Sequence, residues 1–280
     1  MHHTIKQKAA FSMLELIFVI VILGIVASIG SELIAKVYES YIVERAQHRG
    51  SVKTQIAINQ IENFLRNAIP GTVIRRVGLA GAAESLQQAM ASAPGTYTVL
   101  QWVGSDVESF EAINSNVATG VNRRPGWSGF CDINASTQTS IVSPGSNFTL
   151  TNTIQANMGR VGNNFAIYFP NDPVAHFGTG AGNTITLANP AAPIVERYKL
   201  AWTSYALVVD ANSDLRLYYN FTPTIATPIV GPNQILLKNV RNFKFERRGQ
   251  TTRIKLCVEE FIDSNVTGTG IPSCKEKVIF

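Results

Sequence analysis

Histidine is scarce in this sequence, and the motifs that carry enzyme chemistry are missing from it. Only four histidines occur, and His48 and His176, the two beyond the first residues, have no partner at the spacing of a metal site. Residues 126–130, Gly-Trp-Ser-Gly-Phe, lack the last glycine of a nucleophile elbow. Residues 178–183 lack the third glycine of a dinucleotide-binding loop. We therefore expect neither an enzyme nor a bound cofactor or metal.

Charged residues are also few, at 15% of the chain, whereas 45% of the residues are hydrophobic. This composition excludes a disordered chain, and 280 residues suffice for one sizeable core or two small ones. The net charge of +5 includes Lys6 and Lys8, and without them 22 basic residues stand against 19 acidic ones. Such a balance lacks the dense basic footprint of a strong nucleic-acid binder.

Cysteine is limited to Cys131, Cys257 and Cys274. Three cysteines allow at most one internal disulfide and leave one thiol over. A disulfide would require an oxidising compartment.

The N-terminus carries a long apolar run. Residues 11–29 are apolar apart from Ser12, Glu15 and Ser28, which is close to the length that a helix needs to cross a bilayer. Lys6 and Lys8 precede this run without an acidic residue, so the positive-inside rule keeps the N-terminal end in the cytoplasm. We expect the rest of the chain to be exported.

Glu15 is the unusual residue of this segment. A carboxylate in the hydrocarbon region costs roughly 2.5 to 3.5 kcal/mol even on lenient scales, and such groups are usually paired with a specific partner. Two explanations stay open: the carboxylate lies close enough to the headgroups to remain hydrated, or it meets a partner that a simple anchor does not need.

The sequence KQKAAFSMLEL of residues 6–16, followed by an aliphatic run with Gly24, resembles the processing signal of type IV pilins and pseudopilins. In that family a prepilin peptidase removes a short basic leader just before a Phe, the new amino terminus is methylated, and a Glu stands at the fifth mature position. The resemblance assigns cleavage to the bond between Ala10 and Phe11, N-methylation to Phe11 and a role in assembly to Glu15. Ala10 stands where the family usually has Gly.

The physical chemistry of the segment agrees with these roles. A new α-amino group at Phe11 is a cation within the membrane, and the Glu15 carboxylate of a neighbouring subunit can neutralise it. The pair would then set the axial register between subunits. The rival interpretation is an ordinary secretory signal with a cut at Ser31, which a glutamate inside the hydrophobic region disfavours.

Residues 31–69 are predicted to continue the helix as a stalk. Apolar residues recur there at steps of three to five: Val52, Ile56, Ile61, Phe64, Leu65 and Ala68. Pro70 and Gly71 then end the helix. A helix over residues 11–69 is on the order of 90 Å long, so its first half must protrude from the body and its second half can pack on a sheet.

Residues 70–280 are predicted to form a β-rich globular domain. Short β-like runs separated by Gly, Pro, Asn and Ser occur at residues 97–103, 165–169, 197–209, 215–221, 240–247, 252–259 and 277–280. Phe243 and Phe245 alternate with Lys244 and Glu246, which is typical of an antiparallel sheet with one buried face. Residues 79–93 are a candidate short surface helix, and residues 104–164 are predicted to be long loops with a few short strands.

The predicted fold is therefore α+β and pilin-like, with a long N-terminal membrane-spanning helix packed at its C-terminal half on an antiparallel β-sheet. The expected parts are a cytoplasmic leader at residues 1–10, a transmembrane segment at 11–30, a periplasmic helical stalk at 31–69 and a globular domain at 70–280. The large body resembles the J-like and W-like minor subunits of the family. Glu15 argues against the K-like ones, which typically lack the membrane glutamate.

Cys257 and Cys274 resemble the pair that closes a disulfide-bounded loop near the C-terminus of many type IV pilins. Such a bridge would stabilise the fold by about 3 kcal/mol, and two free buried cysteines are the alternative. Cys131 is expected to pack as a small hydrophobe, with an intermolecular bond as the alternative.

Asp210, Asn212 and Asp214 have the spacing of the first half of a calcium loop. The twelfth position of that loop would be Phe221 instead of a bidentate Glu, and a polar hairpin turn explains the pattern better.

Four Asn-x-Ser/Thr sequons occur, at Asn134, Asn147, Asn220 and Asn265. Asn134 and Asn265 also have an acid two residues earlier, which resembles the extended sequon of bacterial N-glycosylation and makes them candidate glycosylation sites. Chance matches are common in a chain so rich in Asn.

Basic residues cluster around one predicted hairpin: Arg241, Lys244, Arg247, Arg248, Arg253 and Lys255. Nucleic-acid phosphates would be attracted to this cluster. A solvated strand face protected from edge pairing is the commoner explanation.

The family resemblance implies a structural subunit, a minor pilin or pseudopilin of a type IV pilus, type II secretion or DNA-uptake fibre. Such a subunit spans the inner membrane once and carries its body in the periplasm or on an extracellular fibre. The implied partners are a prepilin peptidase, other pilin or pseudopilin subunits, an inner-membrane platform protein and the lipid bilayer. The alternative is a membrane-anchored periplasmic enzyme or binding protein with a retained or conventionally cleaved N-terminal signal.

Overall fold

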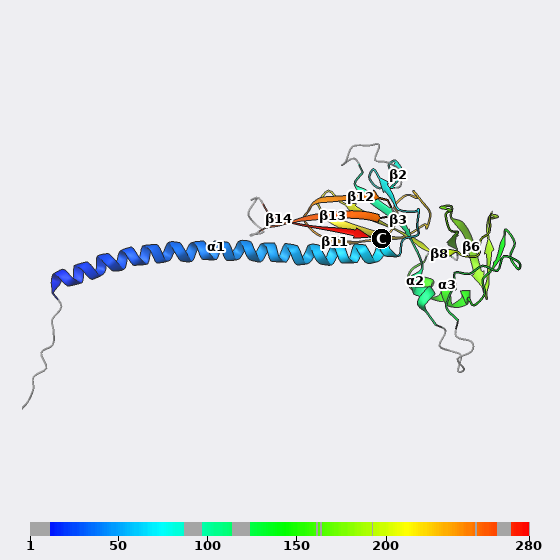
Figure 1. The fold of residues 1–280 in the computed structure, drawn as a ribbon, viewed down its shortest axis with the longest axis horizontal. Coiled ribbons are helices and arrows are strands. Elements are labelled where there is room, and N and C mark those ends of the chain that lie inside the picture. The colour runs from blue at the N-terminus through cyan, green and yellow to red at the C-terminus, as the bar shows by residue number, and fades with distance from the viewer. Residues whose placement is uncertain are drawn as a thin grey trace, which may run out of the picture.

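The computed structural model describes residues 12–86, 97–113, 124–160, 162, 164–191, 193–249, 251–261 and 270–279. One long N-terminal helix projects from a body built mainly of antiparallel strands (Figure 1). The fold class is α+β, in agreement with the sequence prediction.

Helix α1 (Met13–Arg66) is 54 residues long, or about 80 Å. It begins after Ser12, whose hydroxyl accepts a hydrogen bond from the Glu15 amide, and it ends at the C-cap residue Asn67. The helix therefore stops three residues before the expected end at Ile69. The buried side of α1 starts at Ala46, so the first half of the helix touches nothing in the described body.

A six-stranded antiparallel sheet forms the first layer of the body, with the strand order β11-β10-β9-β3-β1-β2. Its strands are β1 (Ile74–Arg76), β2 (Ala83–Ser85), β3 (Val99–Gly104), β9 (Thr203–Val209), β10 (Leu215–Phe221) and β11 (Asn233–Leu237). A three-stranded antiparallel sheet, β12 (Val240–Arg248), β13 (Thr251–Glu260) and β14 (Ile271–Ile279), forms the second layer.

The second half of α1 and the two sheets share one hydrophobic core, and we call this part of the body the proximal lobe. Ile58 and Ile61 of α1 pack there with Trp102 of β3 and Leu256 of β13. On β12 and β13, the apolar side chains face the core and the exposed Lys244 and Lys255 point away from it, as the alternation predicted.

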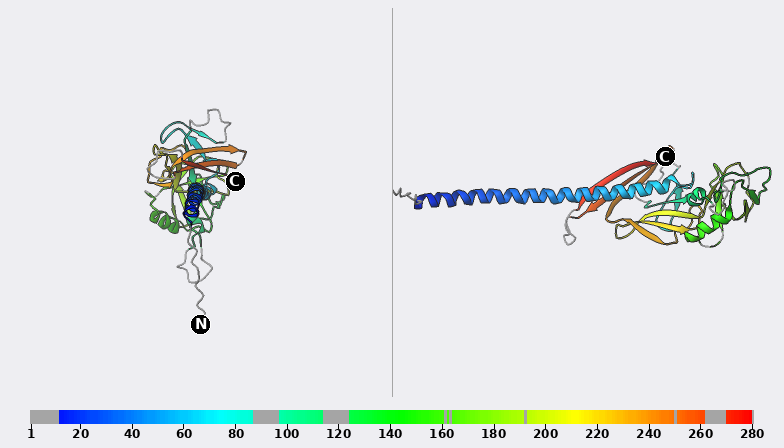
Figure 2. Two further views of the ribbon diagram at one scale, coloured as in Figure 1. Left: turned by 90° about the vertical axis from the view of Figure 1, so that its left-hand side faces the viewer. Right: turned by 90° about the horizontal axis from the view of Figure 1, so that it is seen from below.

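The described residues between positions 105 and 202 form a second part, the distal lobe, with a hydrophobic core of its own. It contains a five-stranded sheet of order β4-β7-β6-β5-β8, and Figures 1 and 2 show that it lies beyond the C-terminal end of α1. Its elements are α2 (Val107–Glu111), β4 (Ser140–Val142), α3 (Phe148–Asn157), β5 (Phe165–Tyr168), β6 (His176–Ala181), β7 (Thr184–Leu187) and β8 (Lys199–Ala201).

The distal lobe leaves and rejoins the proximal lobe at one point. β3 pairs with β9 along its length, and the pairing reaches Gly104 opposite Thr203, the residues that flank the lobe. A side chain at Gly104 would collide with the ring of Tyr205, since a Cβ there would lie 2.4 Å from it. A small apolar cluster that includes Ile69, Val103 and Tyr168 joins the two lobes.

Two sequence predictions of local structure differ from the structure. Residues 79–86 contain the short strand β2 instead of the start of a surface helix, and residues 87–93 of that predicted helix lie outside the described residues. Residues 104–164 contain the helix α3, whose N-cap Asn147 accepts a hydrogen bond from the Leu150 amide and whose buried side includes Phe148, Thr151 and Gln155. Packing of that side holds a helix that the Thr- and Asn-rich sequence favours only weakly.

Candidate functional site

The first turn of α1 positions Glu15. Ser12 and Glu15 stand in the Ser-x-x-Glu arrangement of a capping box, and the Glu15 amide donates to the Ser12 hydroxyl at 3.4 Å. A carboxylate in the first turn also faces the positive end of the helix dipole. Ala10 and Phe11, the predicted cleavage residues, lie outside the described part of the chain.

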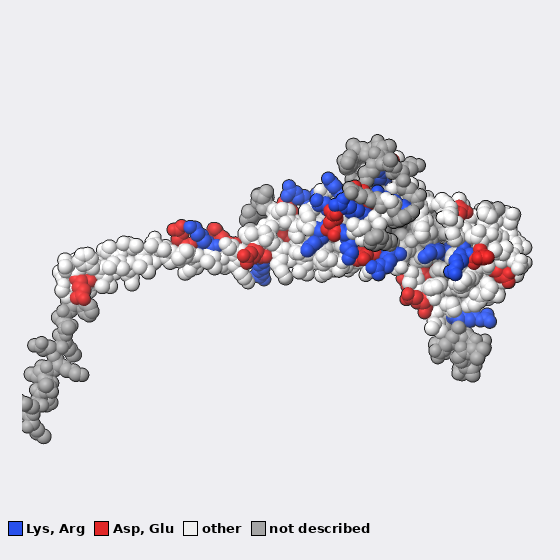
Figure 3. Space-filling view, viewed as in Figure 1, with Lys and Arg blue, Asp and Glu red and all other residues white. Residues whose placement is uncertain are grey.

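The helix after Glu15 is apolar and uncovered on every side. Its large apolar side chains from Met13 to Ile29 each expose 53 to 84% of their surface. Figure 3 shows this part of α1 as an uncharged rod with acidic atoms only at its start, where Glu15 lies in the first turn. Within the described residues, α1 is the one helix long and apolar enough to cross a membrane.

A narrower apolar stripe continues beyond that segment. It consists of the exposed residues Leu33, Ile34, Val37, Tyr38 and Tyr41, and we call it the stalk stripe. Their spacing places them along one side of the helix, and the ion pair between Glu32 and Lys36 lies on the other side. The helix thus presents apolar surface over 29 residues, or about 43 Å, before the body begins to cover it.

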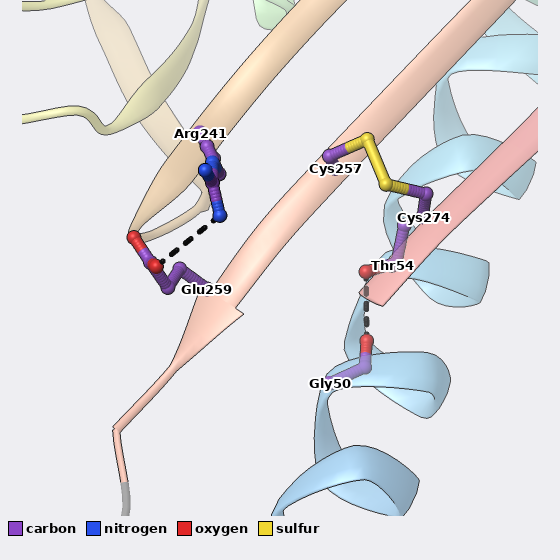
Figure 4. Close-up of a disulfide and its surroundings, with 6 residues drawn as sticks. All are labelled: Gly50, Thr54, Arg241, Cys257, Glu259 and Cys274. Atoms are coloured by element: carbon purple, nitrogen blue, oxygen red, sulfur yellow. Dashed lines mark hydrogen bonds and ion pairs between the residues drawn. A yellow bond between two sulfur atoms is a disulfide. The ribbon is translucent and has the colours of Figure 1, made fainter. Parts of the chain in front are cut away.

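Small residues let the second half of α1 approach the three-stranded sheet closely. A Cβ added at Gly50 would lie 3.1 Å from both Glu260 Cγ and Ser273 Cβ. The buried Thr54 turns its hydroxyl back to the helix and donates to the Gly50 carbonyl at 2.7 Å (Figure 4). Gly50 and Thr54 therefore keep the helix surface flat where β13 and β14 lie against it.

Two ion pairs fasten α1 to the same strands. Lys53 lies 2.5 Å from Glu260 of β13, and Glu62 lies 2.8 Å from Lys277 of β14. The Lys277 ammonium holds the pKa of the Glu62 carboxyl below its ordinary value, and Arg66 of the next helical turn adds to this effect. Both pairs link residues that lie far apart in the sequence.

The predicted cysteine pair is joined in the structure. Cys257 of β13 and Cys274 of β14 are directly opposite in the strand register and form a disulfide (Figure 4). The bond staples β14, the strand that lies along α1, to the middle of its sheet. Cys131 is a buried free thiol in the distal core, and burial raises its pKa.

The candidate glycosylation site Asn134 is exposed in a turn. Asp132, the acid of its extended sequon, accepts hydrogen bonds from the amides of Asn134 and Ala135 and so has a structural use. Asn147 caps α3, and Asn220 donates to the Met158 carbonyl at 3.3 Å. Asn265 lies outside the described residues.

The predicted hairpin turn at residues 210–214 is confirmed. It joins β9 to β10, with Val209 opposite Leu215. The Asp210 carboxylate accepts from the amides of Asn212 and Asp214 and pairs with Arg216, which lowers its pKa. These protein contacts explain the presence of an acidic residue at position 210, and a bound cation is not needed to explain it.

Ser128, the serine of the incomplete nucleophile elbow, belongs to a cluster of hydroxyl groups. Its Oγ lies 3.2 Å from Ser143 Oγ, which in turn lies 2.7 Å from the Tyr198 hydroxyl. Burial raises the pKa of Tyr198 to about 12. Across the parts of the chain that the structure describes, no three His, Cys, Asp or Glu side chains gather as they would around a metal ion.

The basic cluster lies on β12 and β13, where Figure 3 shows Lys and Arg side chains over the region of these strands. Four of its residues, Arg241, Lys244, Arg253 and Lys255, border a groove of about 480 Å³ between β12 and the six-stranded sheet. The structure adds Arg75 and Tyr97 to the groove. Sequence reasoning could not place these two residues there, because they come from segments more than a hundred residues away from β12.

Comparison of the chain with protein-family models, with curated proteins and with solved structures gives no match.

Proposed function

We propose that this chain is a structural subunit of a membrane-anchored fibre, a minor pilin or pseudopilin of a type IV pilus, type II secretion or DNA-uptake system. In this proposal, α1 spans the inner membrane once and the body lies in the periplasm or on an extracellular fibre. A prepilin peptidase cuts before Phe11, and an inner-membrane platform protein and other subunits receive the processed chain.

The uncovered length of α1 is the observation that carries the proposal. A bilayer covers about 30 Å of apolar helix, whereas α1 presents apolar surface over about 43 Å. The stalk stripe extends past the membrane segment and is one-sided, which suits contact with another helix better than contact with lipid. Copies or relatives of the same helix would cover both the stripe and the membrane segment in a fibre.

Glu15 supports the same proposal through its charge. A carboxylate one turn inside an apolar helix is costly in lipid unless it has a partner. The α-amino group that cleavage would create at Phe11 is a cation at the same depth, so the two charges would neutralise each other between neighbouring subunits. This requirement would make assembly specific in register.

Substitution of Glu15 tests the proposal. We expect Glu15→Ala to enter the membrane normally but to yield little fibre or secreted product, because the neighbouring amino group loses its partner. Glu32→Ala is the matched control, since Glu32 is an exposed acid on the same helix with a local partner, Lys36. Fibre amount, secretion and membrane content are measured together.

N-terminal sequencing of the mature chain tests the processing step separately. A chain that begins at methylated Phe11 supports the proposal. A chain that begins at Ser31 would contradict it and favour a periplasmic enzyme or binding protein whose signal is removed by conventional cleavage. A Glu15→Ala variant with normal fibre output would also contradict it.

A further inference from the structure

The groove of about 480 Å³ beside β12 follows the strand for most of its length. Residues 240–246 line it without a gap, so both faces and the outer edge of the strand border the same space. Arg75, Tyr97 and Val209 of the six-stranded sheet and its flanks form the opposite wall. A molecule in this groove would lie along the strand.

β12 is an edge strand. The order of its sheet is β12-β13-β14, and β14 is the strand that lies against α1, so the unpaired edge of β12 faces away from the helix. Among the described strands, β13 is its one partner, and the Val240 amide at the start of the strand donates to the Ser213 carbonyl at 2.7 Å, so the open edge begins after Val240. Such an edge presents alternating N–H and C=O groups, which another extended chain can pair with.

The groove also offers an apolar surface at the repeat of a strand. Phe243 and Phe245 are two residues apart on β12, are half-buried, and place their ring centroids 5.2 Å from each other. Both rings pack on the proximal core and still line the groove. Apolar side chains at every second position of an extended chain would meet this surface.

The charges of the groove select for an acidic occupant. Lys244 and Lys255 stand directly opposite each other on β12 and β13, and both are exposed. The ion pairs found among the described residues include neither lysine, whereas Arg253 pairs with Glu246 and Glu276. Like charges opposite each other destabilise a sheet, although Lys255 also faces Glu276 of β14 on its other side. Five basic and two acidic residues line the groove, so its net charge is positive and repels basic strands.

We propose that the β12 groove binds an extended acidic peptide segment of a partner protein, which adds a strand to the edge of β12. Backbone pairing supplies the affinity, the two phenylalanines receive alternate apolar side chains, and Lys244 and Lys255 pair with carboxylates. The continuous strand edge favours a peptide over a nucleic acid, whose backbone has no donors to match it. The groove includes no residue of α1, so this proposal can be tested separately from the proposed role in fibre assembly.

The test measures binding to the full chain in detergent micelles. The probe is a fluorescent peptide of alternating Glu and Val, about eight residues long to match the strand. A Lys-Val peptide of the same length tests charge, and a Glu-Val peptide with N-methyl groups on alternate amides tests backbone pairing. Oligothymidylate of about fifteen nucleotides tests the nucleic-acid alternative.

We expect the Glu-Val peptide to bind, with affinity that falls as salt rises, and to protect the β12 amides from hydrogen exchange. Lys244→Gln/Lys255→Gln should weaken binding about tenfold. Lys238→Gln, an exposed lysine of the β11–β12 turn outside the groove, should leave it unchanged. The Lys-Val and N-methylated peptides should bind at least about tenfold more weakly.

Three results would overturn the proposal. One is equal binding of the N-methylated peptide, which would mean that charge attraction by itself explains the binding and that no strand is added. Another is tighter binding of oligothymidylate with the same lysine dependence, which would make the groove a nucleic-acid site. The third is absence of peptide binding to a chain that remains folded by circular dichroism.

Discussion

Gly50 decides how closely the three-stranded sheet can approach α1. Because Glu260 and Ser273 already lie 3.1 Å from the position of its missing Cβ, a large side chain there must push β13 and β14 away. We expect Gly50→Leu to lower the free energy of unfolding by about 1–3 kcal/mol. Gly30→Leu is the control, since Gly30 has nothing within 4 Å. Urea unfolding measures both, and equal stability of the two variants would contradict the role given to Gly50.

Asp106 makes the distal lobe sensitive to pH. Its carboxylate is buried and raised in pKa by that burial, although the Gln155 side chain and Ser109 donate hydrogen bonds to it. The folded protein therefore holds this proton at pH values where the unfolded chain has lost it. The contribution of Asp106 to stability is largest below its unfolded pKa of about 4 and falls as pH rises toward the folded pKa.

Asp106→Asn isolates this effect, because Asn keeps the shape and caps α2 equally well. We expect the stability of the wild type relative to the variant to decrease as pH rises above about 4. Urea unfolding midpoints of both proteins at a series of pH values give the difference in their stability. The effects of the other titrating groups cancel in this difference, because both proteins contain them. A difference that is flat or rises with pH would show that burial does not dominate the pKa of Asp106.

Single residues illustrate what a sequence can and cannot reveal. The turn at Asp210 was predictable because its partners, Asn212 and Asp214, are two and four residues away. The disulfide came from a family resemblance, and the structure supplies the reason that the two sulfurs meet, which is the strand register. Asp106 gave no signal, because its burial depends on Gln155, a residue of another helix.

The stalk stripe of α1 gives the next prediction. We expect Val37→Lys to leave the stability of the body unchanged, because the stripe lies before the first buried residue, Ala46. In the proposed fibre the same change should strongly reduce assembly by placing a charge at a helix contact. Lys36→Glu, on the polar side of the same turn, is the matched control. Fibre amount and urea unfolding are the measurements.

Normal assembly of Val37→Lys would mean that the stripe contacts no neighbour. Loss of assembly in both variants would instead show that assembly is sensitive to any change of charge along the stalk. The two outcomes separate a contact surface from a property of the whole helix.

Elements with a clear apolar pattern could be predicted from the sequence, and elements without one, such as α3, could not. Repeating apolar patterns extend over many residues in α1, β12 and β13, and these patterns can be seen directly in the local sequence. β1 and β2 have three residues each, and β1 contains Arg75 and Arg76, both buried. Arg76 is satisfied by Gln101 and the Thr227 carbonyl, partners that lie far along the chain. No local pattern predicts a buried strand of this kind.

The distal lobe is inserted between two paired neighbours, β3 and β9, and this allows it to be removed. We expect a chain in which an Asn-Gly turn replaces residues 105–202 to keep the proximal fold, because Gly104 and Thr203 already stand opposite each other. The denaturant dependence of unfolding should fall by about a third with the surface removed. Exposure of Ile69 and Val103 at the junction should cost some stability.

Trp102 reports on this experiment without interference. It is fully buried in the proximal core, and the other two tryptophans, Trp127 and Trp202, belong to the removed segment. A blue-shifted emission that changes in one cooperative transition supports an independent proximal lobe. Emission typical of water-exposed tryptophan would show that the two lobes fold only together.

The division into two lobes could not be read from the sequence. A single body was expected over residues 70–280, because the chain between β3 and β9 has no linker composition at either end. β8 and β9 are separated only by Trp202, so one extended segment serves both lobes. The groove beside β12 is likewise assembled from three distant segments, and only the folded chain brings them together.

The alignment of β14 with α1 has a mechanical consequence. Moving along both elements in the same direction, Ser273 lies at Gly50 and Lys277 at Glu62, so strand and helix run side by side. Tension applied to the N-terminal end of α1 is therefore directed along this seam and loads it in shear. All contacts along the seam then resist the tension together instead of separating one by one. These contacts are the ion pairs, the buried side of α1 and the strand β14, which the disulfide joins to its sheet. The body can thus be pulled by its helix while the distal lobe, past the end of the seam, stays free of the load.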